Sequence, residues 1–381
     1  MIKPEDFYLW LTTANIEFFS GVPDSLLKDI CGYITDNTPP EKHITAANEG
    51  NAIALAAGYH MASGTIPMVY MQNSGLGNTV NPLLSLTNKQ VYDIPLLMLI
   101  GWRGEPEKKD EPQHVAQGRL TVELLKTMEV PYQILSNDTE IAKKQFDLAM
   151  AHIFENNQPY ALVIRKGLFE GYKLKTTIDN NYTLIREEAI KQIVEKLSGN
   201  EIIVSTTGKT SRELFEIREA LGQGHDSDFL TVGCMGHANQ IAIGMAIATP
   251  NRRIICIDGD GALLMHMGSM AINGAVSPKN FIHIVINNSS HESVGGQPTV
   301  AGNIDVVKIA EANNYKSAIS ISSPEALDEI LTDIRTIEGP ALIEIKTKIG
   351  SRDDLGRPTI KPVDNKNALI QNFKAKQMTE T

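Results

Sequence analysis

The sequence predicts an α/β protein with two doubly wound, parallel-sheet domains. Three observations support this fold class. The chain has 381 residues, against about 100 to 200 for a typical domain. Short runs rich in β-branched residues alternate with longer segments of helical periodicity, a pattern typical of βαβ units. The alternation stops in one polar stretch, residues 166–182, and then begins again.

In the first half, short apolar segments are separated by helical patterns. The expected strands are residues 17–19, 43–46, 67–71, 95–100 and 160–164. Residues 48–61 and 139–154 repeat apolar side chains at helical spacing. The charged, proline-containing segment 103–114 follows a strand. We expect it to be a mobile loop at the carboxyl edge of the sheet, where open α/β sheets bind ligands.

The polar stretch marks the expected domain boundary. We predict one domain over residues 1–175 and a second over residues 183–370, with a polar tail from about Gln371 that is frayed. The second domain should begin with a helix near residues 187–197. Its expected strands are residues 201–205, 229–232, 253–257, 281–287 and 341–345.

Composition excludes several classes of protein. Hydrophobic residues make up 42% and charged residues 21% of the chain, which excludes disordered and collagen-like proteins. The net charge of -10 opposes binding to nucleic acid or to anionic membranes. The three cysteines are odd in number and form no CxxC pair, which favours reduced thiols. With neither a signal-peptide pattern nor a bilayer-length apolar run, the expected location is cytoplasmic.

Polar side chains end two neighbouring strands of the second half. One strand runs into Asp258-Gly259-Asp260-Gly261, and the next ends in Asn287-Asn288 after 25 intervening residues. That length suits one helix and one strand, so the carboxylate and the amide should lie side by side at one sheet edge. Such oxygen ligands suit Mg²⁺ holding a diphosphate. Asp-Gly pairs also form ordinary turns, but two adjacent amides after an apolar strand have no packing purpose.

A second candidate phosphate site follows an earlier strand. The segment 206–211, Thr-Thr-Gly-Lys-Thr-Ser, opens a helix, so its backbone N–H groups can hold a diphosphate end. An ordinary N-cap is the alternative. The segment lacks the full P-loop pattern, which argues against a nucleotidase.

The spacing of the GDG and NN motifs resembles that of thiamine diphosphate-dependent enzymes. The resemblance implies that Asp260, Asn288 and the backbone carbonyl of Ser290 bind Mg²⁺. It also implies two domains of the thiamine diphosphate-binding type, a pyrimidine-binding one followed by a diphosphate-binding one. In the second half the resemblance implies cofactor contacts at Gly233, Met235, Asp260 and Asn288. The strand-end turns described above add Thr207, Gly208, Gly259 and Gly261 as expected contacts to the diphosphate.

The same resemblance requires a glutamate at the start of a helix in the other domain. The segment 47–52 is similar to that helix start, which makes Glu49 the candidate. Its carboxyl group would share a proton with the aminopyrimidine N1′, so that the 4′-imine can deprotonate thiazolium C2. Met235 would support the bent cofactor, and the Gly233 carbonyl would accept a hydrogen bond from the 4′-amino group.

Motifs spread over nearly the whole chain resemble the short decarboxylases of phosphonopyruvate and sulfopyruvate, which lack the central domain of larger relatives. The motifs are residues 21–25, 101–104, 110–114, 207–212 and 293–298, with His291. The single-chain form is most similar to the phosphonopyruvate branch, which implies formation of phosphonoacetaldehyde and CO₂ from a small anionic 2-oxo acid. Sulfopyruvate decarboxylation and an acetolactate synthase-type carboligation are the alternatives.

The resemblance places Asp24 and His114 near the carbon that is protonated after CO₂ leaves. Larger pyruvate decarboxylases have a glutamate six residues beyond the second Asn, but Val294 stands there in this chain, so the proton donor stays open. Candidates for binding the substrate's anionic group are Arg103, Lys209, Arg212, His291 and Arg357, each of which could equally be a solvated charge.

The two cofactor motifs also imply an assembly. Glu49 lies in one half and Asp260 in the other, and they would contact opposite ends of one cofactor. We therefore expect active sites between the subunits of a homodimer or homotetramer.

Overall fold

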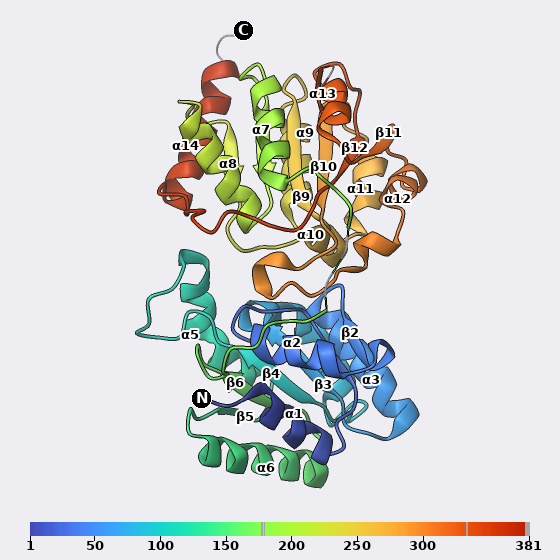
Figure 1. Cartoon of the computed structure of the whole chain (residues 1–381), viewed down its shortest axis with the longest axis vertical. Helices are drawn as coiled ribbons and strands as arrows, with labels where there is room; N and C mark the ends of the chain where they lie inside the picture. Colours follow the sequence, from blue (N-terminus) through green and yellow to red (C-terminus); the bar gives the residue numbers. More distant parts are fainter. Residues whose placement is uncertain (177, 179, 333, 378–381) are drawn as a thin grey trace. The chain divides into compact units, whose positions relative to one another are not determined.

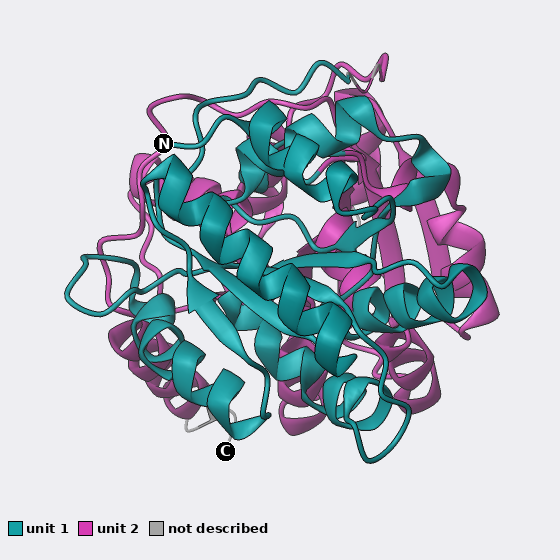
Figure 2. Cartoon of the chain, turned by 90° about the horizontal axis from the view of Figure 1, so that it is seen from below, with its two compact units in different colours: residues 1–177, 291–297 teal, residues 178–290, 298–381 magenta. Residues whose placement is uncertain are grey.

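Two six-stranded sheets, each with all its strands parallel, organise the chain (Figure 1). The computed structural model describes residues 1–176, 178, 180–332 and 334–377. One sheet lies in unit 1, which comprises residues 1–177 and 291–297, and the other in unit 2, which comprises residues 178–290 and 298–381 (Figure 2). The predicted fold class is confirmed.

The sheet of unit 1 has the strand order β2-β1-β3-β4-β6-β5. Its strands are β1 (Phe19–Gly21), β2 (His43–Thr45), β3 (Met68–Gln72), β4 (Leu97–Gly101), β5 (Tyr132–Ile134) and β6 (Tyr160–Ile164). Its helices are α1 (Pro4–Thr13), α2 (Lys28–Asn37), α3 (Glu49–Ser63), α4 (Leu76–Pro82), α5 (Pro112–Thr127) and α6 (Thr139–Asn156), with the short turns η1 (Pro40–Lys42), η2 (Asn73–Gly75) and η3 (Leu83–Thr87). Met68 and Tyr70 face one apolar cluster while Val69 and Met71 face another, so both faces of the sheet are buried.

The sheet of unit 2 has the order β11-β12-β10-β9-β7-β8. Its strands are β7 (Ile202–Ser205), β8 (Asp228–Leu230), β9 (Ile254–Gly259), β10 (Phe281–Asn287), β11 (Ser317–Ile321) and β12 (Ala341–Lys346). Its helices are α7 (Arg186–Lys196), α8 (Lys209–Ala220), α9 (Ala238–Ala248), α10 (Asp260–Met265), α11 (Ser269–Val276), α12 (Val306–Ala312), α13 (Pro324–Thr332) and α14 (Pro362–Gln377), with the turn η5 (Val300–Asn303). The turn η4 (Glu292–Val294) lies in the segment 291–297, which belongs to unit 1 although the residues on either side of it belong to unit 2.

The two sheets share one topology. In each sheet the first strand lies between the second and the third, and the sixth lies between the fourth and the fifth. This order places a topological switch point beside β1 and β3 in unit 1, and beside β7 and β9 in unit 2. Ligands of doubly wound sheets bind at the carboxyl ends of the strands at such points.

Three sequence predictions are corrected by the structure. The first strand is displaced by two residues, to Phe19–Gly21. The segment predicted as loop up to His114 is already helical from Pro112, because a proline is well suited to the first helical position. The polar tail is helical through Gln377, since α14 buries Leu369 and packs near β8.

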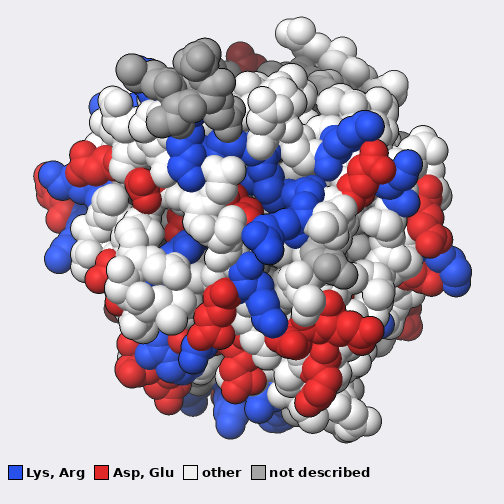
Figure 3. All heavy atoms as spheres, turned by 90° about the horizontal axis from the view of Figure 1, so that it is seen from above, with Lys and Arg blue, Asp and Glu red and all other residues white. Residues whose placement is uncertain are grey.

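Three further features concern the described chain as a whole. Among the described residues, no helix combines the length and apolar character needed to cross a membrane. The three cysteines are unpaired, with Cys31 and Cys256 buried and Cys234 exposed. The negative charge is unevenly distributed, since Lys and Arg side chains form a band on the face shown in Figure 3.

Candidate active site

The strand ends of unit 2 bring Asp260 next to the turn after β10. Parallel β9 and β10 pair Gly259 with Ile286, so the residues that follow leave the sheet together. Asp260 is the first residue of α10 and is 5% exposed. Its Oδ2 accepts a hydrogen bond of 2.6 Å from Thr299 Oγ1. Burial nevertheless raises the pKa of Asp260 to about 6, although Thr299 and the backbone N–H groups of Gly261 and Ser289 lower it. A nearby cation would offset this cost of burying the charge.

The two adjacent asparagines have different surroundings. Asn287 Nδ2 donates to Glu344 Oε1 on β12 at 2.7 Å, so this amide does pack into the fold and the expectation that neither amide has a packing purpose is wrong. Asn288 Oδ1 accepts from the backbone N–H of Ser290 at 3.0 Å, which forms a tight turn. The buried Ser290 Oγ has no hydrogen-bond partner among the described residues.

This donor set fits a hard divalent cation. The Asp260 carboxylate, the Asn288 amide oxygen and the Ser290 carbonyl are all oxygen ligands, which Mg²⁺ prefers. An amide oxygen has two lone pairs, so the turn hydrogen bond leaves Asn288 Oδ1 able to bind a metal. The buried Asp260 carboxylate supplies the negative charge.

The neighbouring strand end provides room for an anion. Gly208 is the N-cap of α8 with φ 99°, and a Cβ built there would meet nothing within 4 Å. Because Gly208 has no side chain to cap the helix, first-turn N–H groups of α8 can donate to a ligand. Thr207 Oγ1 instead accepts from the N–H of Gly233 at 2.9 Å, which ties this turn to the next loop.

That next loop, residues 232–236, has an unusual backbone. Gly233, Cys234 and Gly236 have φ values of 65°, 51° and 87°. A Cβ at Gly236 would lie 2.7 Å from Cδ2 of His266, so a larger residue would displace that ring. The loop presents Met235, which is half-buried, and the exposed Val232 and Cys234.

In unit 1, Glu49 is the first residue of α3 and is 5% exposed. Asn78 Nδ2 donates to its Oε2 at 2.7 Å. A Cβ at Gly75 would lie 2.3 Å from its Oε1, so only glycine there leaves space for the carboxylate. The helix N-terminus favours a negative charge at this position.

Asp24 follows β1 at the switch point of the same unit. It is fully buried, and its oxygens accept from Gln72 Nε2 at 2.6 Å and from the N–H of Leu26 at 3.0 Å. Burial raises the pKa of Asp24, although Gln72, the backbone and the charge of Arg103 lower it.

Arg103 is paired inside its own loop. Its Nε donates to Asp110 Oδ2 at 2.9 Å, and its Nη1 donates to Ser25 Oγ at 3.1 Å. Asp110 also accepts from the N–H groups of Gly104 and Glu111, at 2.7 and 2.8 Å. The Asp110 carboxylate therefore holds both ends of residues 104–111 and offsets the charge of Arg103.

Asp110→Asn should loosen this loop without unfolding unit 1, because the amide cannot accept all of these bonds as an anion does. We expect trypsin to cleave after Lys108 or Lys109 several-fold faster in the variant, with mass spectrometry identifying the site. Glu107→Gln, in the same exposed loop, is the matched control and should be cleaved at the wild-type rate. Equal cleavage of the Asp110 variant and wild type would contradict this assignment.

His114 lies in the first turn of α5 and is 8% exposed. Its Nδ1 has no hydrogen-bond partner among the described residues. Burial and the charge of Arg103 lower the pKa of His114 to about 4, although Asp110 raises it. The ring is therefore neutral near pH 7.

This pKa predicts a pH effect on stability. Because the folded pKa of about 4 is below the unfolded value of about 6.5, the His114 contribution is fully present above pH ~6.5 and is lost as the pH falls toward 4. In urea unfolding at pH 7 and pH 5, His114→Gln should lose less stability on acidification than wild type. Identical losses in the two proteins would refute the assignment.

Comparisons with known proteins agree with this geometry. Residues 5–125 match the N-terminal, and residues 206–345 the C-terminal, thiamine pyrophosphate-binding domain of thiamine pyrophosphate enzymes. Over 379 residues the chain is 32% identical to a phosphonopyruvate decarboxylase of Streptomyces viridochromogenes, an alignment that covers 96% of this chain and 93% of the relative. This chain belongs to the thiamine diphosphate-dependent decarboxylases.

Two more distant decarboxylases also align along most of the chain. A sulfopyruvate decarboxylase of Methanosarcina acetivorans is 25% identical over 375 residues, covering 92% of this chain and 93% of the relative. The solved 4-hydroxybenzoylformate decarboxylase of Rhodococcus jostii RHA1 is 13% identical, with a TM-score of 0.39. The alignment covers 92% of this chain and 99% of that decarboxylase.

Thiamine diphosphate is thus the cofactor of this decarboxylase.

Several residues that contact the candidate site residues were not predicted from the sequence. Thr299, Gln72, Asn78 and Asp110 each hold a candidate site residue. Gln72 could have been found, because it ends β3 at the switch point. Asn78 lies on α4 and Thr299 precedes η5, and the sequence carries no spacing that indicates their pairs. Asp110 belongs to the motif 110–114, but its pairing with Arg103 was not predicted.

The remaining candidates for anion binding lie in different surroundings. Lys209 is the first residue of α8 and is half-buried, as is Arg212 one turn later. Arg357 is exposed in the loop before α14. His291 belongs to the excursion 291–297 of unit 1, and burial lowers its pKa to about 4, so its ring is neutral near pH 7.

Proposed function

We propose that this enzyme decarboxylates phosphonopyruvate to phosphonoacetaldehyde and CO₂ with bound thiamine diphosphate and Mg²⁺. The alignment with phosphonopyruvate decarboxylase carries the proposal, because it spans 96% of this chain at 32% identity. When bound, thiamine diphosphate would supply the nucleophilic C2 carbanion for the keto carbon, and its thiazolium ring would accept the electron pair left when CO₂ departs.

The proposed role of Glu49 is to hold a proton at the pyrimidine N1′. The carboxylate is buried at the start of α3, and Asn78 fixes its Oε2. The hydrogen bond from Asn78 engages only Oε2, so Oε1 is the oxygen proposed to face a ligand nitrogen. This geometry supports proton sharing with a heterocycle.

Asp260, Asn288 and the Ser290 carbonyl are the proposed ligands of Mg²⁺. Backbone N–H groups near Thr207 and Gly208, and near Gly259 and Gly261, would hold the diphosphate. Gly233 and Met235 are the proposed contacts to the aminopyrimidine and to the underside of the bent cofactor. The oxygen donors, the open space beside Gly208 and the partly exposed loop 232–236 support these roles.

Of the two candidate proton donors, the surroundings favour Asp24. Burial raises the pKa of Asp24, which helps the group keep a proton to donate. His114, with a pKa of about 4, is neutral near pH 7 and a weak acid. Its unpartnered Nδ1 suits it to orient the substrate by a hydrogen bond.

Asp110 offsets the charge of Arg103, which leaves Lys209, Arg212, Arg357 and His291 as the other candidates for the phosphonate. We propose Lys209 and Arg212 first, because Lys209 begins α8 beside the open space at Gly208 and Arg212 follows three residues later in the same helix. Helix N-termini favour anions, which adds to their attraction for phosphonate.

A homodimer or homotetramer with active sites between subunits is the proposed assembly. Helix α9 is apolar around most of its circumference, and Ile247 on it is 59% exposed. On α11, Ile272 is 54% exposed, and on α3, Met61 is 67% exposed. Helices that are apolar all round are normally buried, so these surfaces support self-association. Light scattering coupled to gel filtration would measure the oligomeric state and so test this assembly.

The cytoplasmic location stays a prediction.

Aldehyde formation tests the substrate directly. Phosphonopyruvate, sulfopyruvate and pyruvate are compared in a coupled aldehyde assay, with and without Mg²⁺ and thiamine diphosphate. The proposal expects the highest kcat/KM with phosphonopyruvate and no activity after both cofactors are removed. A preference for sulfopyruvate would favour the alternative that the 25% identical relative suggests. Formation of a carbon–carbon coupled product instead of aldehyde would indicate a carboligase.

A further inference from the structure

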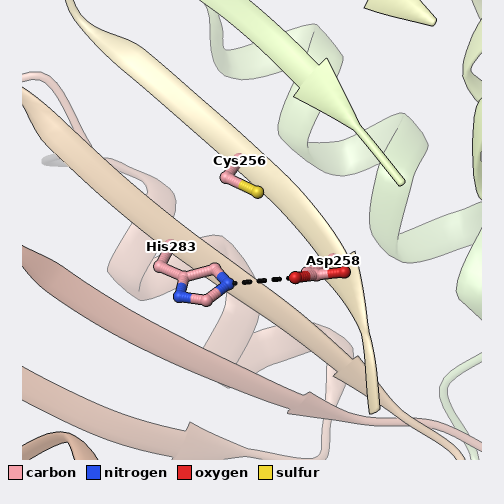
Figure 4. A group of neighbouring side chains, drawn as sticks. All are labelled: Cys256, Asp258 and His283. Carbon is pink, nitrogen blue, oxygen red and sulfur yellow. Dashed lines mark hydrogen bonds and ion pairs between the residues drawn. The ribbon is translucent and has the colours of Figure 1, made fainter. Parts of the chain in front are cut away.

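A buried group of titratable side chains adjoins the metal loop of unit 2, which we define as residues 259–261, where β9 passes into α10. Cys256 and Asp258 are on β9 and His283 is on β10, with the side chains facing one another on one side of the sheet (Figure 4). All three are fully buried. Their potential ligand atoms lie within 4.8 Å of one another. The group therefore fits either a soft metal ion or a hydrogen-bonded chain.

The hydrogen bonds around His283 favour the chain. Asn273 Oδ1 accepts from Gln240 Nε2 at 2.6 Å, so its Nδ2 donates to the hydroxyl of Tyr315 at 2.9 Å. Tyr315 can then give its own proton to His283 Nδ1, 3.2 Å away. With Nδ1 accepting from Tyr315, Nε2 is the nitrogen that donates to Asp258 Oδ2, 3.4 Å away.

A metal ion is disfavoured by the same arrangement. A ligating histidine normally donates from its second nitrogen to an acceptor, whereas here the second nitrogen accepts. In the metal-free protein, burial raises the pKa of the Cys256 thiol well above its usual value, and the charge of Asp258 raises it further.

The end of this chain of bonds reaches the metal loop. Asp258 Oδ1 accepts from the N–H of Gly259 at 3.0 Å, immediately before Asp260 begins α10. Asp258 is thus held from both sides, by His283 on one oxygen and by the loop backbone on the other. The N–H of Gly259 in turn fixes the direction in which the chain leaves β9.

We propose that His283 and Tyr315 are positioning residues for the cofactor metal, acting through Asp258 to hold the turn from which Asp260 binds Mg²⁺. The proposal rests on the proposed function only in taking Asp260 as a metal ligand. Residues that orient metal ligands typically contribute about 10- to 100-fold to metal affinity. Both side chains should therefore change the affinity for Mg²⁺ more than the rate at saturation.

Three variants and one control test this. Tyr315→Phe removes a single oxygen, and His283→Leu removes the donor to Asp258. His283→Gln is the conservative variant, because its amide can still donate to Asp258. Asn280→Ser is the matched control: the Asn280 amide donates to the carbonyls of Ala246, Thr249 and Arg252 before β10, at the opposite end of the strand from the metal loop.

Isothermal titration calorimetry measures Mg²⁺ binding to the EDTA-treated full chain in excess thiamine diphosphate, and thermal unfolding of the metal-free protein is recorded in parallel. We expect the Kd for Mg²⁺ to rise about tenfold in Tyr315→Phe and His283→Leu, and less in His283→Gln. The kcat at saturating Mg²⁺ should stay near wild type. Asn280→Ser should lower the Tm while leaving the Kd unchanged.

Two results would overturn this inference and leave the proposed function intact. In the first, wild type binds Mg²⁺ with thiamine diphosphate, and Tyr315→Phe and His283→Leu lower the Tm but bind Mg²⁺ equally well. In the second, elemental analysis finds stoichiometric zinc that His283→Leu loses, so that the group is a metal centre. If wild type itself shows no Mg²⁺-dependent cofactor binding, the proposed function falls together with this inference.

Discussion

Glu49→Gln is expected to lower kcat by about a thousandfold or more while thiamine diphosphate still binds with Mg²⁺. Glutamine has nearly the shape of glutamate and can keep the contact with Asn78, but it cannot share a carboxyl proton with the pyrimidine N1′. General acid–base groups contribute about 10²- to 10⁴-fold to enzymatic rates. Steady-state kinetics and calorimetric titration of the cofactor measure the two quantities separately.

The control for this variant must separate catalysis from helix stability. Glu140 is also an acidic residue in the first turn of a helix, α6, and is exposed. Glu140→Gln removes a comparable interaction with the helix dipole, which is worth about 0.3 to 1 kcal/mol. It should retain wild-type kcat. Near-normal turnover in Glu49→Gln would remove Glu49 from the mechanism.

The strands that could be predicted with correct bounds are the fully buried ones, because burial on both faces requires a continuous run of apolar residues. β6 and β10 have the predicted bounds because every residue of each is buried and nearly all are apolar. β5 and β11 were not predicted. They are edge strands, and four of the five residues of β11, Ser-Ala-Ile-Ser-Ile, are partly or fully exposed. Neither β5, whose three residues are all half-buried, nor β11 has the continuous buried run that β6 and β10 have.

The candidate site was predictable to the extent that it depends on order along the chain. The GDG and NN motifs end consecutive strands, and parallel pairing then places Asp260 beside the turn after β10. The Asn287–Glu344 and Thr299–Asp260 pairs join residues 57 and 39 positions apart. Such pairs are decided by tertiary packing, for which this single sequence provides no local pattern.

Asp260→Asn is expected to abolish Mg²⁺-dependent binding of thiamine diphosphate, and with it all activity. The substitution keeps the shape of the side chain but removes the negative charge among the proposed ligands. The loss in Mg²⁺ affinity should exceed the about 10- to 100-fold that follows when a partner outside the ligand set is removed. Asp305→Asn, at the N-cap of α12 in the same unit, is the matched control and should bind Mg²⁺ normally.

The raised pKa of Asp260 adds a pH dependence with a definite sign. Because its folded pKa is about 6 and its ordinary value is 3.8, protons should compete with Mg²⁺ below pH ~6, weakening binding up to about tenfold per pH unit. In the metal-free protein the same shift contributes stability that is present below pH ~4 and lost as the pH rises through about 6. Asp260→Asn should remove this stability change, which urea unfolding without metal measures. A wild-type Mg²⁺ affinity that is constant from pH 7 to pH 5, or an Asn variant that binds Mg²⁺ as tightly as wild type, would exclude Asp260 as the metal ligand.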